Sequence, residues 1–176
     1  MELINFAING QEYHLLLNGT ALFNCYDRLG REKTLMDHLE AGDKQGYDNM
    51  LWMLCEFAMQ GELYRRWQGE DRGPILQYAR AAAEVLPSQL PQLKLALAAT
   101  IRNGFTRQHL SDEDSDPWLA EIEQKKNDRI TRAQYLRVVT HILGLSVKEG
   151  MILPPGVALD MLRLEADSHK RRKGDK

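Results

Sequence analysis

Apolar residues alternate on both sides of an Asn9-Gly10 dipeptide near the N-terminus. Asn-Gly is the pair best suited to a two-residue turn in which both central residues take positive φ. Such a turn places Phe6 opposite Tyr13, and opposed residues of a hairpin share one face. Because turn type and apolar register agree, the sequence predicts an antiparallel hairpin over about residues 3–17. An isolated hairpin is marginally stable, so this one must pack against the rest of the chain.

The chain after the hairpin shows helical periodicity divided by glycine and proline. A helix beginning near Thr20 is expected to stop at Gly30, and a long helix is expected from about Asp48 to Trp67. Pro74 is expected to open the next helix, because proline is favoured in a first helical turn, and Pro87 to end it. The buried stripe expected for that helix is Ile75, Tyr78, Ala79, Ala82 and Leu86.

The C-terminal third contains two capping-box patterns, Thr131 with Gln134 and Ser146 with Glu149. We expect a mainly α protein with a small N-terminal β-hairpin (α+β), forming a compact bundle of about six to eight helices. The expected parts are a hairpin plus helical core over residues 1–110, a C-terminal helical subdomain over 117–166 and a disordered basic tail over 167–176. An acidic linker over 111–116 separates the first two parts.

Composition narrows the class of protein. Hydrophobic residues make up 43% and charged residues 27%, which is enough to bury a core and argues against disorder through most of the chain. The net charge of -2 is not that of a dedicated nucleic-acid binder. No apolar run is long enough to cross a bilayer, and no signal peptide is recognisable. Cys25 and Cys55 lie in apolar helical patterns, so buried thiols are favoured over a disulfide.

The polar residues form no arrangement typical of catalysis or metal binding. The five histidines are dispersed without i, i+4 pairs, and there is no Cys-x-x-Cys. The sequence also lacks a glycine-rich phosphate loop and a Gly-x-Ser-x-Gly elbow. We therefore expect no catalytic, metal-binding or cofactor-binding residues and a protein that is not an enzyme. An enzyme with an unrecognised site stays open as a further hypothesis.

The turn at Gly144 between two helical segments also permits a helix-turn-helix interpretation. The following helix would then read the major groove. It carries Glu149, its only basic residue is Lys148, and Pro154 ends it within about two turns. A small helix-turn-helix-like DNA-binding regulator is therefore the alternative function.

The segment from Met50 to Met59 is apolar over nearly its whole circumference. Such a helix is either the most buried helix of the core or one that buries a second face against a partner, and both interpretations remain open. Methionine side chains adapt to varied partner surfaces, and tryptophans can anchor an interface. The expected partner-binding residues are Met50, Met53, Met59, Trp67 and Trp118.

Two parts of the chain carry a family resemblance. The first comprises Ile8-Asn9-Gly10-Gln11-Glu12-Tyr13-His14-Leu15 and the run from Asn18 to Gly30. The second comprises Ile142-Leu143-Gly144-Leu145-Ser146-Val147-Lys148-Glu149, Leu153-Pro154-Pro155-Gly156 and Leu159-Asp160. These segments resemble the opening and closing segments of tail assembly chaperones of long-tailed bacteriophages. The middle of the chain, from Asp48 to Asn127, matches only as generic helix.

The resemblance implies a role in tail building. Tail assembly chaperones coat the long helical tape measure protein, keep it soluble and help recruit tail tube subunits. The expected partners are therefore the tape measure protein and the tail tube protein, with self-association as a further expectation and no membrane or nucleic-acid partner. The expected location is the host cytoplasm and not the mature virion.

Overall fold

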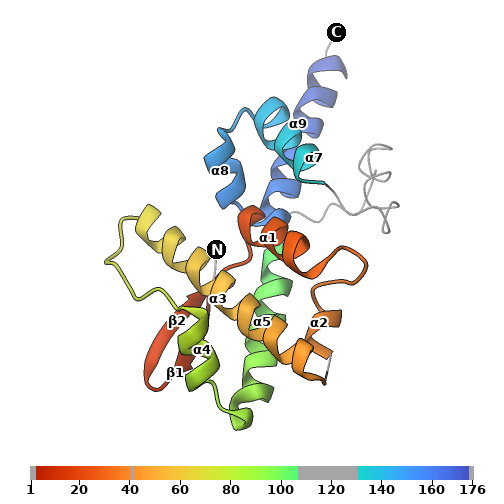
Figure 1. Ribbon diagram of the computed structural model, residues 1–176. Helices are drawn as coiled ribbons and strands as arrows, with labels where there is room; N and C mark the ends of the chain where they lie inside the picture. Colours follow the sequence, from red (N-terminus) through yellow and green to blue (C-terminus); the bar gives the residue numbers. More distant parts are fainter. Residues whose placement is uncertain (1–2, 41, 107–130, 175–176) are drawn as a thin grey trace. The chain divides into compact units, whose positions relative to one another are not determined.

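The computed structural model describes residues 3–40, 42–106 and 131–174, with side chains up to Glu165 in the last helix (Figure 1). Within these residues the chain is mainly helical and has a two-stranded N-terminal hairpin, so the predicted fold class is confirmed. The chain divides into two compact units, unit 1 (Met1–Gly104) and unit 2 (Phe105–Lys176). The expected acidic linker and the helix after Pro117 lie outside the described residues.

The hairpin forms in the predicted register. Strand β1 (Ile4–Ile8) pairs antiparallel with β2 (Gln11–Leu15), and Phe6 lies opposite Tyr13. Asn9 and Gly10 have φ of 48° and 79°, as a two-residue turn with positive φ at both positions requires. Phe6 and Tyr13 are both buried, so one face of the hairpin faces the core.

Unit 1 contains a chain of helices after the hairpin, namely α1 (Gly19–Leu29), α2 (Asp37–Glu40), α3 (Lys44–Trp67), α4 (Tyr78–Glu84), the short 3₁₀ helix η1 (Pro87–Gln89) and α5 (Leu90–Phe105). Helix α1 ends before Gly30, which has a φ of 84°, as expected. Helix α3 begins earlier than expected, at Lys44, because the Asp43 side chain accepts a hydrogen bond of 2.7 Å from the Gly46 amide. A side-chain cap of this kind satisfies an amide that would otherwise lack a partner.

Helix α3 is the central element of unit 1, and strand β2 lies directly on it (Figure 1). The Leu16 amide donates a hydrogen bond of 3.0 Å to the carbonyl oxygen of Phe57. One helical turn further, a Cβ on Gly61 would overlap the carbonyl group of His14. Glycine at this position therefore permits the strand backbone to touch the helix backbone.

One apolar core fills the space between the hairpin and the helices. The hairpin and each α-helix of unit 1 contribute side chains to this core, so each element is stabilised by its contacts with the others. The largest fully buried ones are Phe6, Ile8, Leu15, Leu17, Leu22, Phe23, Leu51, Met53, Leu54, Phe57, Leu93 and Leu97.

The prediction for the helix after Pro74 was wrong in its start and in its buried face. Helix α4 begins at Tyr78, and residues 68–77, hereafter the strap, have no regular structure. The buried residues are Leu76, Ala81 and Val85, whereas Ile75, Tyr78 and Leu86 are exposed. Apolar periodicity did not identify the buried face because alanine and other apolar residues occur around the whole circumference of this short helix.

Unit 2 contains α7 (Arg132–Arg137), the π-helical segment η2 (Val138–Ile142), α8 (Val147–Ile152) and α9 (Pro155–Gly174). Both predicted capping boxes are present: Thr131 caps α7 with Gln134, and Ser146 caps α8 with Glu149. The hydrogen bonds from Ser146 lower the pKa of the Glu149 carboxyl.

The prediction of a disordered tail over 167–176 differs from the structure, because helix α9 continues to Gly174. The sequence contains no proline or glycine between Val157 and Lys173, so nothing in it breaks the helix before that point. No helix among the described residues is long and apolar enough to cross a membrane.

Substitution of Gly61 by alanine tests the contact between β2 and α3. The added methyl group would overlap the His14 carbonyl, and a backbone neighbour cannot move aside cheaply. We expect Gly61→Ala to lower the free energy of unfolding by about 2–3 kcal/mol, although alanine is the better helix former. Urea denaturation measures the change. The matched control is Gly42→Ala, where a Cβ meets open space; equal stability of the two variants would contradict the packing described.

Candidate functional site

The five residues expected to bind a partner have different surroundings. Met50 and Met53 are buried in the core of unit 1, so the expectation that they meet a partner is corrected. Met59 is half-buried and Trp67 is 52% exposed, so part of each side chain is accessible to a partner. Trp118 lies outside the described residues.

Helix α3 has two apolar faces, which explains this difference. One face, with Met50, Met53 and Phe57, packs into the core beneath the hairpin. The other carries Trp52, Cys55, Met59, Leu63 and Trp67, whose three- and four-residue spacing keeps them on one side of the helix. We call these five residues the outer stripe.

The outer stripe becomes more exposed toward the C-terminal end of α3. Trp52 and Cys55 are half-buried and pack against the edge of the core, and Met59 is half-buried, whereas Leu63 is 42% exposed. The ring of Tyr64 packs beside Trp67 with centroids 5.9 Å apart, which holds the tryptophan against the end of the helix. At the other end, the Arg28 guanidinium lies 5.7 Å from the centroid of the Trp52 ring.

One flank of α3 is covered by the strap, which is attached through the buried Glu62 carboxylate. Its Oε1 accepts hydrogen bonds from the Gly73 amide at 2.6 Å and from Arg66 Nε at 2.7 Å. Arg66 also donates to the Gly73 carbonyl at 3.2 Å, and Arg65 Nε donates to Glu70 Oε2 at 2.7 Å. Because a buried carboxylate needs such partners, Glu62 makes the strap part of the fold.

The other flank is covered by α1 through buried amide and carboxylate groups. Asn18 Nδ2 donates to Gln60 Oε1 at 3.1 Å, and Gln60 Nε2 donates to Glu56 Oε1 at 3.0 Å. The same Glu56 oxygen accepts a bond of 2.9 Å from Asn24 Nδ2. These polar groups connect α1 to α3 and are satisfied within the fold.

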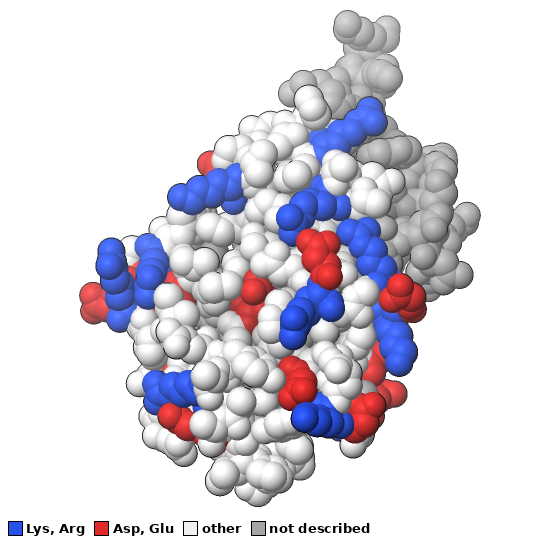
Figure 2. Space-filling view, in the orientation of Figure 1, with Lys and Arg blue, Asp and Glu red and all other residues white. Residues whose placement is uncertain are grey.

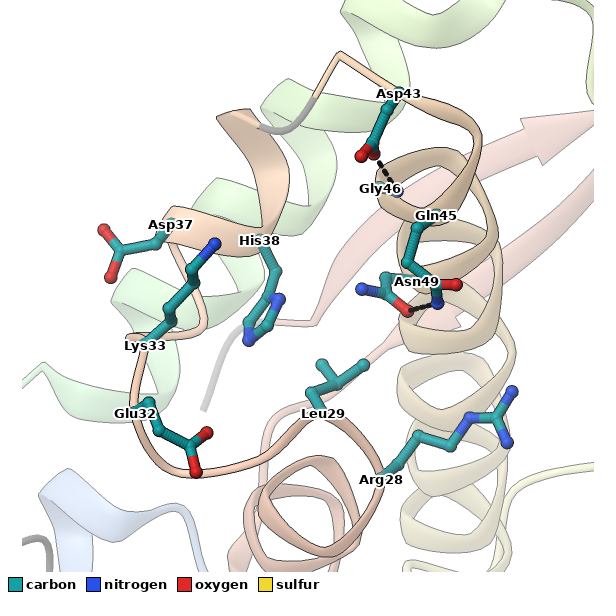
Figure 3. A pocket seen from close by; sticks show the side chains of 10 residues that line it. All are labelled: Arg28, Leu29, Glu32, Lys33, Asp37, His38, Asp43, Gln45, Gly46 and Asn49. Carbon is teal, nitrogen blue, oxygen red and sulfur yellow. Dashed lines mark hydrogen bonds between the residues drawn. The ribbon is translucent and has the colours of Figure 1, made fainter.

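A pocket of about 350 Å³ lies between the end of α1, the turn before α2 and the start of α3 (Figure 3). Its lining carries side chains of both charges, including Arg28, Lys33, Glu32 and Asp37. Within this pocket, Asp43 is occupied in capping α3, and Gln45 donates to Asn49 at 2.9 Å. The lining also includes the buried His38, which lies on α2 beside Asp37 (Figure 3).

The described residues contain no group of three or more His, Cys, Asp or Glu side chains that could hold a metal ion. His14 lies on the hairpin opposite Asn5, and its Nδ1 is 2.8 Å from Asn5 Oδ1. That pairing gives His14 a structural role at the surface of the hairpin.

Unit 2 contains the turn that permitted a helix-turn-helix interpretation. Gly144 has a φ of 65°, which favours glycine, and it separates η2 from α8. A Cβ on Gly150 would overlap the Val139 side chain, so a glycine within α8 allows the two segments to pack closely. The buried Tyr135 hydroxyl donates to the Gly150 carbonyl at 3.0 Å. Helix α8 has only 6 residues, which is short for reading a major groove.

The cysteines are both free thiols, but they differ in burial. Cys25 is fully buried in α1, whereas Cys55 is half-buried in the outer stripe. Burial, assisted by the nearby Glu56 carboxylate, raises the pKa of Cys55 to about 11. The same causes raise the pKa of Cys25 further.

Leu63, Ile75 and Tyr78 are exposed apolar residues that the sequence analysis did not assign to a surface. Leu63 had a usable signal, since it lies four residues from both Met59 and Trp67. Ile75 and Tyr78 had none, because their apolar spacing is equally typical of a core face.

Comparison with known proteins adds no assignment. No family model, no curated protein and no solved structure matches this chain.

Thiol labelling tests the placement of the two cysteines. Cys55 is expected to react slowly with a maleimide in the native protein and Cys25 only after unfolding, because the buried thiol is inaccessible. Since the thiolate reacts, and the pKa of Cys55 is about 11, its rate should rise roughly tenfold per pH unit from pH 7 toward that value. Mass spectrometry after brief labelling identifies the site. Preferential native labelling of Cys25 would contradict the burial described.

Substitution of Glu62 by glutamine tests the attachment of the strap. The charge that holds Arg65 and Arg66 is lost, so the strap should open more often. Trypsin is then expected to cleave after the exposed Arg72 several times faster than in the unsubstituted protein. The matched control is Glu84→Gln, which removes a more exposed ion pair with Arg80 on α4. Equal cleavage of the two variants would show that Glu62 does not hold the strap.

Proposed function

We propose that this protein is a tail assembly chaperone of a long-tailed bacteriophage, which binds the tape measure protein and helps recruit tail tube subunits. The hairpin followed by α1 agrees with the opening segment that carries the family resemblance. Its proposed place of action is the host cytoplasm during tail assembly.

The observation that carries the proposal is the outer stripe of α3. Met59, Leu63 and Trp67 form an apolar row that is partly open to solvent, while the opposite face of the same helix is buried. Exposed apolar surface of this kind marks sites where proteins bind other proteins. A long helical partner with apolar rows of its own would aggregate alone, and covering those rows would keep it in solution.

The use of the polar residues supports the same conclusion. Glu62 attaches the strap, whereas Glu56 and Gln60 connect α1 to α3. The described carboxylates and amides at these positions therefore stabilise the fold, and their hydrogen-bonding groups face each other. A binding surface made of apolar side chains does not require these hydrogen-bonding groups to contact the partner.

A small DNA-binding regulator is the second candidate, and the Gly144 turn in unit 2 favours it. Two features weigh against it: α8 has 6 residues, and Glu149 lies in its first turn. DNA affinity that falls steeply with salt concentration would support this candidate over the chaperone.

Co-expression with the tape measure protein encoded in the same tail gene cluster tests the proposal. The tape measure protein should be insoluble alone and soluble together with this protein, because its apolar rows are then covered. Affinity purification should yield a complex with several copies of this chain per tape measure chain, countable by native mass spectrometry.

The matched control is co-expression of the tape measure protein with an unrelated helical protein of similar size. A tape measure protein that is equally soluble with the control, or a complex that does not survive purification, would reject the chaperone function.

A further inference from the structure

We draw no further inference here: the strongest candidate, the apolar surface over α3 and α4 (Figure 2), which exposes Leu63, Trp67 and Tyr78, carries no proposal because nothing in the structure shows what covers it.

Discussion

The contact between strand β2 and helix α3 is the constraint on which the rest of unit 1 depends. Gly61 lets the His14 carbonyl touch the helix backbone, and the Leu16 amide binds the Phe57 carbonyl one turn away. With the hairpin fixed on this face, its apolar side chains close the core over Met53 and Phe57. The opposite face of α3 is then left for other contacts.

Hydrogen bonds of buried polar groups attach neighbouring segments to both flanks of α3. Only its outer face is therefore left to contact another protein. Glu62 holds the strap on one side, and Glu56 and Gln60 hold α1 on the other. Buried charged and amide groups must be satisfied, so these residues specify where the neighbouring segments lie. What stays open between the two flanks is an apolar row, and an apolar row is suited to binding another protein.

Features that depend on residues close together along the chain formed as predicted, whereas one that depends on a distant segment did not. The Asn9-Gly10 turn and the capping box at Ser146 depend on residues within a few positions, and both formed as predicted. The start of α4 was wrong because the Gly73 amide binds Glu62, a residue eleven positions away on another helix. Pro74 is suited to a helix start, but that attachment keeps the strap extended past it.

The sequence by itself determined the helical class, the hairpin register and the two capping boxes at Thr131 and Ser146, because each depends on residues that are close together along the chain. It also identified an α3 helix with more apolar surface than a single core contact uses. Only the tertiary structure decided which apolar residues are surface: Met50 and Met53 are buried, whereas Leu63 and Tyr78 are exposed. The physical reason is that burial depends on which distant segment covers a face, and periodicity cannot distinguish two apolar faces of one helix.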